Sequence, residues 1–282
     1  MTTQSPSTYA RIVGAAAWVT LIAAPAKAGE RSDGPGCAGT GPQAPRDIEA
    51  RSGSNPTRFA TAPRYQDMNL CNIHVHSNAE HKGEGFATLM GKGDHRGYVC
   101  DGEARGGGHA AATRPSGHGG RDDGGDRGDG CGGVSVGDTV EVHWVFSTCV
   151  VAPGPGLGSC LSATCTNPQL RVEAAVFYLT DGVAGELDFA DYRVVERDGR
   201  PQPGELPSGR GAVEYPGSTT GPSFDNVTTC SPLQVTWNVR RGCKPLAKRS
   251  LDRWCRGNAF DEGHAHGVRR LVTAERLLAP IH

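Results

Sequence analysis

The chain has 282 residues, and its 29 Lys and Arg against 30 Asp and Glu leave a formal net charge of -1. This balance gives no reason to expect nucleic acid or an anionic membrane surface as a partner. The length is sufficient for one large domain with a sizeable hydrophobic core.

Residues 1–28 have the pattern of a secretory signal peptide. Arg11 precedes an apolar run from Ile12 to Ala24, and Ala26-Lys27-Ala28 offers small residues for cleavage. The run is shorter than a helix needs to span a bilayer comfortably. We therefore expect export to the periplasm or the extracellular space, removal of this segment, and no membrane insertion of the mature chain.

The remaining chain divides by composition. Residues 29–65 are rich in Gly, Pro, Ser and Arg with little periodicity, which predicts an irregular N-terminal region. Residues 66–282 are expected to form the main, functional domain, with an insertion at residues 102–133 in which 13 of 32 residues are Gly. Such a segment buries too little apolar area to offset its ordering entropy, so we expect it to be flexible.

The first strand signal is Asn72-Ile73-His74-Val75-His76. Successive side chains of a strand point to opposite faces, so His74 and His76 share one face while Ile73 and Val75 enter a core. Two imidazoles side by side on a strand are well placed to bind a transition metal such as zinc.

A second strand, Asp138 to Phe146, has matching chemistry, because Glu141 and His143 share a face. Three histidines without an obvious fourth protein ligand are typical of a catalytic zinc site, which leaves one position open. Asn72 and Glu141 each lie two residues before a histidine and could orient it through its second ring nitrogen. Such a site would also accept cobalt or cadmium. The alternative is two amphipathic strands with solvent-exposed histidines.

Further strands are predicted at Arg171 to Thr180 and at Leu233 to Val239. Helical signals are scarce, and the best is a short piece from Thr273 to Leu278. The fold class is therefore mainly β: a single domain on a twisted, largely antiparallel sheet with few short helices and disulfide-stapled loops.

All ten cysteines follow the signal segment. An even number in an exported chain predicts disulfides formed in an oxidising compartment. Only one pairing is suggested by the sequence, between Cys100 and Cys131, which bracket the Gly-rich insertion.

These motifs resemble the zinc site of carbonic anhydrases. The Asn-x-His-x-His and Glu-x-His strands are similar to those of the α class, as is the stretch from Tyr215 to Trp237, which contains Tyr-Pro-Gly-Ser, Thr-Thr and Val-Thr-Trp. The compact Cys-Asn-Ile-His-Val-His-Ser-Asn-Ala-Glu-His at 71–81 and the tail at 263–272 resemble the δ class more closely. The resemblance extends from about residue 65 to the end of the chain.

The resemblance implies an α-carbonic-anhydrase-like fold and the reversible hydration of CO₂ to bicarbonate and a proton, by attack of zinc-bound hydroxide. It implies one Zn²⁺ per chain, bound by His74, His76 and His143. It also implies that Glu80 accepts a hydrogen bond from a gatekeeper threonine. Thr228 is the candidate for that threonine, and the alternatives are Thr219, Thr220 and Thr229.

Proton transfer to buffer usually needs a histidine whose pKa lies near ambient pH. The candidates for such a shuttle are His81, His95, His264 and His266, whereas His109 and His118 are expected to be exposed bystanders. For Glu80, the alternative role is a surface carboxylate paired with Lys82.

Two other functions are compatible with the same residues. One is an exported zinc hydrolase or esterase that uses the same three-histidine site; a peptidase is disfavoured because no His-Glu-x-x-His motif is present. The other is a non-enzymatic zinc-binding protein of the cell envelope. No oligomeric state is predicted.

Overall fold

The computed structural model describes residue 37 and residues 39–91, 96–102, 130–218, 224, 229–268 and 272–282. These residues all fall in the unit Ser32–His282. The predicted signal segment, most of the Gly-rich insertion, His95, His109 and His118 therefore lie outside the described residues.

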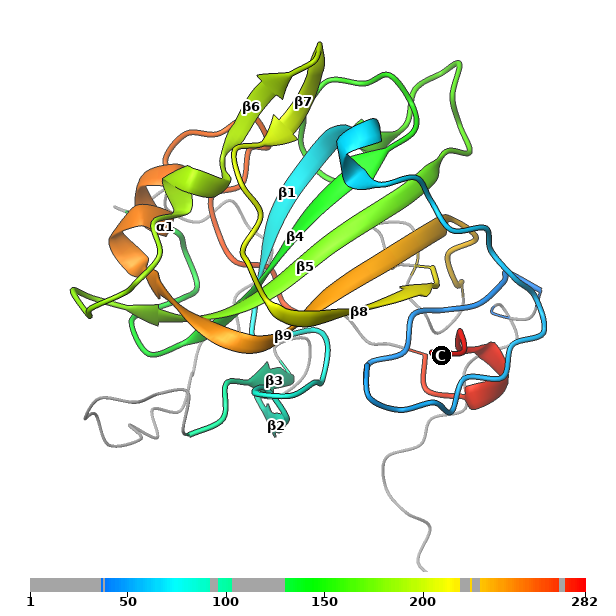
Figure 1. Ribbon diagram of the computed structural model, residues 1–282, viewed down its shortest axis with the longest axis horizontal. Coiled ribbons are helices and arrows are strands. Elements are labelled where there is room, and N and C mark those ends of the chain that lie inside the picture. The colour runs from blue at the N-terminus through cyan, green and yellow to red at the C-terminus, as the bar shows by residue number, and fades with distance from the viewer. Residues whose placement is uncertain are drawn as a thin grey trace, which may run out of the picture. The chain divides into compact units, whose positions relative to one another are not determined.

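The central element is a five-stranded sheet with the strand order β1-β4-β5-β9-β8 (Figure 1). Neighbouring strands are antiparallel, apart from β5 and β9, which are parallel. This confirms the predicted class, a mainly β protein on a largely antiparallel sheet. The strands of the sheet are β1 (Asn69–Ser77), β4 (Thr139–Ser147), β5 (Gln169–Thr180), β8 (Arg210–Pro216) and β9 (Gln234–Ala247).

The remaining elements are short. Two small antiparallel pairs accompany the sheet: β2 (Thr88–Met90) with β3 (Gly97–Val99), and β6 (Val194–Arg197) with β7 (Arg200–Pro203). The helical elements are the α-helix α1 (Lys248–Cys255) and the 3-10 turns η2 (Tyr65–Asp67), η4 (Leu157–Cys160), η5 (Phe189–Tyr192) and η6 (Glu275–Leu277).

The sheet carries a hydrophobic cluster on each face, of which the alternation of β1 and β4 predicts only the one opposite the histidines. Ile73, Val75 and Trp144 belong to one cluster, together with α1 and η5 residues. Val145, Val172 and Trp237 belong to the other cluster, which lies on the histidine face. Burial on both sides makes the strand register strict, because a slip of one residue would exchange the two sets of side chains.

A β-bulge in β1 supplies an extra residue to the histidine face. The register with β4 shifts between Leu70 and Asn72. As a result Leu70 packs in one cluster and Cys71 in the other, while Asn72 also points to the histidine side. A bulge places two residues opposite one and re-aims side chains locally. Here it lets Cys71 bind Cys160 while Asn72 still reaches His74.

The helix α1 was not predicted. It follows β9 directly and has no side-chain hydrogen bond at its N-cap, Ala247, so the usual start signal is missing. It forms because Leu251, Trp254 and Cys255 lie on one face and pack into the core. The predicted helical piece near Thr273 to Leu278 is only the 3-10 turn η6.

All ten cysteines are paired in five disulfides, which is typical of an oxidising, exported environment. The predicted Cys100–Cys131 pairing is wrong. Cys100 binds Cys243 and Cys131 binds Cys255, so each end of the insertion is tied to the C-terminal part of the chain. The other pairs are Cys37–Cys230, Cys71–Cys160 and Cys149–Cys165.

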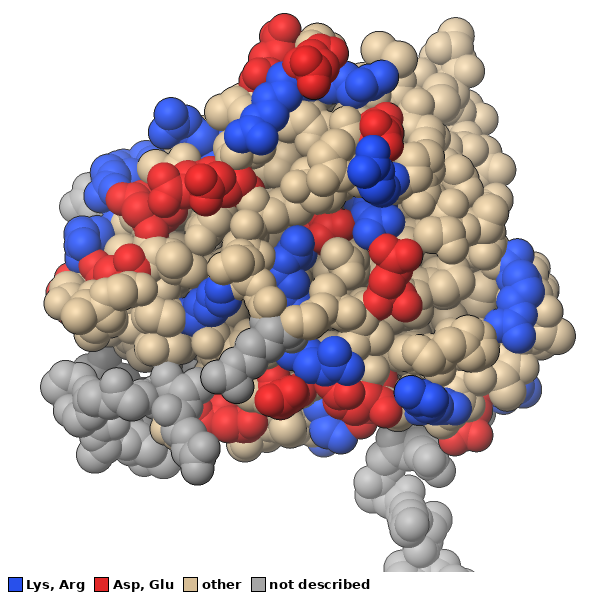
Figure 2. Space-filling model, in the orientation of Figure 1, with Lys and Arg blue, Asp and Glu red and all other residues tan. Residues whose placement is uncertain are grey.

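Acidic and basic side chains are interspersed on the face shown in Figure 2. Several charged side chains of the described residues are paired, for example Arg171 with Glu173 and Glu214. Among the described residues, no helix has the length and apolar character needed to cross a membrane.

Candidate metal centre

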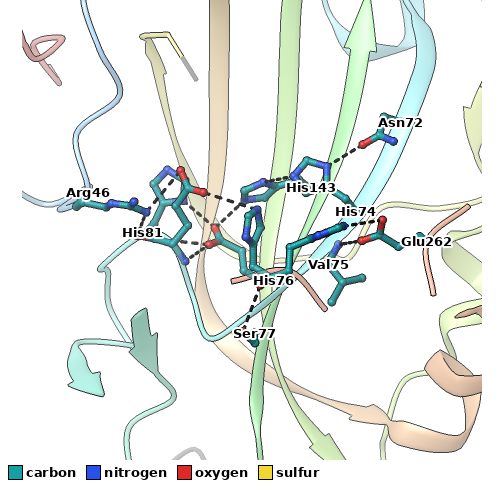
Figure 3. Close-up of polar contacts among 12 residues, drawn as sticks. Arg46, Asn72, His74, Val75, His76, Ser77, His81, His143 and Glu262 are labelled. Carbon is teal, nitrogen blue, oxygen red and sulfur yellow. Dashed lines mark hydrogen bonds and ion pairs between the residues drawn. The ribbon is translucent and has the colours of Figure 1, made fainter. Parts of the chain in front are cut away.

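The three predicted ligands meet on one face of the sheet, close to the sheet edge formed by β1. His74 pairs directly with His143 across β1 and β4, and His76 lies two residues further along β1. The ring centroids are 5.0 Å apart for His74 and His76, and 4.9 Å from each of these to His143 (Figure 3). Antiparallel pairing therefore brings together residues that are 69 positions apart.

The donor atoms of this triad converge as a metal requires. One ring nitrogen from each histidine lies within 4.8 Å of the others. Nδ1 of His143 is 3.1 Å from Nε2 of His74, and the buried Nδ1 of His76 has no hydrogen-bond partner among the described residues. Three neutral nitrogen donors with an open fourth position suit Zn²⁺. The residues present thus fit a divalent metal.

Asn72 fixes the orientation of His74. Its Nδ2 donates to the carbonyl oxygen of Gly154 at 3.0 Å, which leaves Oδ1 facing Nδ1 of His74 at 2.8 Å. An amide oxygen at this position accepts the Nδ1 proton. The lone pair of His74 is then on Nε2, the atom that points into the triad.

Glu141 is the centre of a buried network behind His143. Its Oε1 lies 2.7 Å from Nδ1 of His81 and 3.3 Å from Nε2 of His143. Its Oε2 accepts the backbone N–H groups of Glu80 and His81 at 2.5 and 3.2 Å. Because Nε2 of His143 faces Glu141, Nδ1 of His143 faces the other two histidines.

A second group of possible ligands consists of His81, Glu141 and His143. It is the weaker candidate, because the carboxylate of Glu141 already accepts three hydrogen bonds from His81 and the backbone. In the triad of His74, His76 and His143, by contrast, Nδ1 of His143 and Nε2 of His74 face each other, and Nδ1 of His76 has no partner in the part of the chain that the structure describes.

The pKa shifts follow from burial and from Glu141. Burial lowers the pKa of His74 well below its ordinary value, and it lowers the pKa of His76 to about 4. Burial also acts to lower the pKa of His143, but the carboxylate of Glu141 outweighs it and raises that pKa. Burial acts to raise the pKa of Glu141, yet His81 and His143 hold it well below the ordinary value. His74 and His76 are therefore neutral at physiological pH, as metal ligation requires.

Glu80 is buried beside the triad rather than exposed. Its side chain is 4 % exposed, its Oε2 lies 3.7 Å from Nε2 of His76, and its Oε1 lies 3.5 Å from Nη1 of Arg46. Lys82, the alternative partner, instead pairs with Asp47 at 2.5 Å. Arg46 was not singled out in the sequence, because it lies in the irregular N-terminal region without a local pattern.

The gatekeeper threonine stays a prediction. Thr228 lies outside the described residues, as do Thr219 and Thr220. Thr229 is described and exposed, next to Cys230, which is bonded to Cys37.

The tail segment carrying His264 and His266 runs along β1. The N–H of His266 donates to the carbonyl oxygen of Val75, and the N–H of Ser77 donates to that of His266, both at 2.7 Å. The His266 ring is 6.5 Å from that of His74 and 4.6 Å from that of exposed His264. His81, by contrast, is fully buried.

Sequence reasoning did not find Glu262, which holds this tail in place. Its Oε1 accepts the N–H of Val75 at 2.8 Å, and its Oε2 lies 3.0 Å from Nε2 of His266. Its spacing of four residues before His266 was the one available signal, and that spacing is common on any chain.

Fold and site together define a β-sheet protein with a three-histidine cluster on the face of its sheet that could hold a metal ion. A sequence profile of the family described as delta carbonic anhydrase matches residues 65–250, about two thirds of the chain. The chain therefore belongs to the delta carbonic anhydrase family. This membership supports a role as an enzyme of CO₂ hydration and implies a bound metal. No curated protein matches the sequence significantly.

Proposed function

We propose that this protein catalyses the zinc-dependent, reversible hydration of CO₂ to bicarbonate and a proton. The observation that carries the proposal is the convergence of His74, His76 and His143 within a chain of the delta carbonic anhydrase family. Zinc held by three neutral histidines lowers the pKa of a bound water so that hydroxide is available near neutral pH, chemistry for which carbonic anhydrases are the standard example.

The chain's own residues orient that site. Asn72 holds the ring of His74 by a hydrogen bond, and the Glu141 carboxylate lies 3.3 Å from Nε2 of His143, on the side of that ring away from His74. We assign Glu80 the role of orienting the nucleophilic water through a threonine, for which Thr228 is the candidate. The Glu80 carboxylate lies beside the buried His76 ring, with Oε2 3.7 Å from Nε2, and this position fits the role.

An apolar wall beside the triad suits a small apolar substrate. Val145, Val172 and Trp237 are in register across β4, β5 and β9, in the row next to His143. All three are buried, and the Trp237 ring is 5.2 Å from that of His143. CO₂ has no net dipole, so we propose that this wall receives it.

The proton has a route to solvent along the tail segment. His74 is partly exposed while His76 and His143 are buried, so the site opens toward His266. We propose that exposed His264, adjacent to His266, passes the proton to buffer. His81 is completely buried and therefore does not suit that role. Its hydrogen bond to Glu141 gives it a positioning role instead.

The direct test is stopped-flow CO₂ hydration by the mature, zinc-quantified protein, compared with a chelated sample and the same sample after zinc is restored. We expect hydration far above the buffer rate that disappears and returns with zinc. A fully zinc-loaded protein without activity on CO₂ would overturn the proposal, and ester substrates would then be tested.

A further inference from the structure

The positively charged side chain of Arg46, in the N-terminal region, reaches Glu80 beside the histidine triad. Nη1 of Arg46 donates to the main-chain carbonyl oxygen of Glu80 at 2.6 Å and lies 3.5 Å from Oε1 of the same residue (Figure 3). The Arg46 side chain is 15 % exposed and the Glu80 side chain 4 %. Arg46 lies outside residues 65–250, the part of the chain that the family profile covers.

The backbone around Arg46 is held against the same loop. The N–H of Lys82 donates to the carbonyl oxygen of Arg46 at 2.8 Å, and the N–H of Ile48 donates to that of Lys82 at 3.0 Å. Close approach is needed here, since a Cβ on Gly83 would come within 2.8 Å of the Ile48 side chain. The Arg46 backbone is therefore fixed against the loop that carries Glu80, which keeps the guanidinium within reach of that residue.

The two oxygens of Glu80 have different neighbours. Oε1 faces Arg46, while Oε2 faces Nε2 of His76 at 3.7 Å. A buried carboxylate without a counter-charge is strongly unfavourable. Removing one partner of a buried ion pair lowers the stability of the folded protein by several kcal/mol. Arg46 thus accounts both for the burial of Glu80 and for which of its oxygens is turned toward the histidine triad.

We propose that Arg46 is a positioning residue that fixes the Glu80 carboxylate toward the metal site, so that the catalytic unit begins before the matched region. The inference rests on the proposed function, in which Glu80 orients the nucleophilic water. Arg46 acts through Glu80 and does not itself contact the triad in this assignment.

The test compares Arg46→Gln, which removes the charge and keeps a donor for the Glu80 carbonyl, with Arg46→Lys, which keeps the charge. Arg241→Gln is the matched control, because Arg241 pairs with Glu49 in the same N-terminal region, on the surface. At equal zinc content we expect Arg46→Gln to lower kcat about 10- to 100-fold with little change in KM, as misplacing a catalytic group does. Arg46→Lys should recover most of the rate, and Arg241→Gln should match the wild type.

A double-mutant cycle with Glu80→Gln shows whether Arg46 acts through Glu80. We expect Arg46→Gln to cause little further loss in the Glu80→Gln background, since residues that act as a unit are not additive. Full additivity, or wild-type kcat in Arg46→Gln, would overturn the inference. Should Arg46→Gln not fold, a folded Arg46→Lys variant that loses as much rate as Glu80→Gln would overturn it.

A readout independent of CO₂ hydration is the visible absorption of the cobalt-substituted protein as a function of pH. We expect the pH at which the absorption changes to differ between Arg46→Gln and the wild type, and to be the same in Arg241→Gln as in the wild type. If the wild type does not hydrate CO₂ but the cobalt transition still depends on Arg46, the proposed function fails and the positioning role stands. An unchanged cobalt transition with unchanged kcat would remove Arg46 from the site.

Discussion

Nδ1 of His143 lies 3.1 Å from Nε2 of His74, although 69 positions separate the two residues in the chain. At this distance the two nitrogens are within hydrogen-bonding range of each other, so in the metal-free protein one of them carries the proton that the other accepts. Burial acts to lower the pKa of His143, but the Glu141 carboxylate outweighs it and raises that pKa. A metal bound by both nitrogens takes the place of the shared proton, so metal binding depends on pH.

The first prediction is that His143→Ala removes metal binding and activity together. Without His143, only His74 and His76 of β1 remain as ligands of the proposed site, and a site with two protein ligands holds zinc poorly. We expect the zinc content, measured by atomic emission after dialysis, to fall from about one per chain to near zero, and CO₂ hydration to fall to the buffer rate. A His143→Ala protein with stoichiometric zinc and full rate would contradict the assignment.

The second prediction concerns Asn72. Because its amide oxygen holds Nδ1 of His74, Asn72→Ala should weaken zinc affinity about 10- to 100-fold, the usual effect of losing an outer partner of a ligand. Affinity is measured by competition with a chromophoric chelator.

Asn69→Ala is the matched control, since Asn69 is a buried asparagine of the same strand whose Nδ2 donates to the carbonyl oxygen of Cys149. It should lose stability through that hydrogen bond but keep the wild-type affinity. Equal affinity losses in both variants would mean that the effect is one of strand packing and not of ligand orientation.

The part of this site that the sequence could predict is the part carried on strands. A period of two assigns Asn72, His74 and His76 to one face, and the same rule assigns Glu141 and His143. Pairing of the two strands was then the only missing step, and the structure supplies it in direct register. The same period places Val235, Trp237 and Val239 of β9 on a common face, where they pack in one cluster.

The parts that could not be predicted depend on contacts between distant segments without a local pattern. Arg46 lies in an irregular stretch, and its position is set by backbone pairing with Lys82. The partner of Cys100 is Cys243, which is 143 residues away in the sequence, so proximity to Cys131 along the chain was misleading. The helix α1 was missed because tertiary packing, and not a capping signal, defines it.

The third prediction is a pH dependence of the metal-free protein. Burial lowers the pKa of His76 from an ordinary 6.5 to about 4, so between these values the unfolded chain binds a proton that the folded chain does not. The free energy of unfolding therefore falls as the pH falls through this window, by ~1 kcal/mol between pH 6 and pH 5 from His76 alone. His74, whose pKa burial also lowers, contributes in the same direction. His143 has the opposite sign, but its contribution is already complete below pH 6.5.

The measurement is the urea midpoint of the chelated protein at pH 6 and pH 5, with His76→Gln as the comparison. Glutamine does not titrate, so the variant should lose about 1 kcal/mol less over this interval. The same loss in both proteins would show that His76 is not held neutral by the fold.

The fourth prediction concerns proton release through His264, which is exposed and lies beside His266. His264→Ala should leave zinc content and kcat/KM unchanged, because neither depends on the transfer of the proton to buffer. It should lower kcat roughly tenfold at low buffer concentration, since general acid–base groups contribute at least that much. Adding imidazole at millimolar concentration should restore kcat, because a small base can take the proton directly.

His282→Ala is the matched control, as His282 is also an exposed histidine but lines a pocket with Glu49 and Arg241 that no residue of the triad lines. It should keep the wild-type kcat at every buffer concentration. If His264→Ala also keeps the wild-type kcat, the proton leaves by another route. His266→Ala is then the variant to measure next, because the His266 ring contacts the rings of both His264 and His74. If His264→Ala loses rate but imidazole fails to restore it, the loss comes from displacement of the tail that Glu262 holds against β1, and the shuttle assignment is wrong.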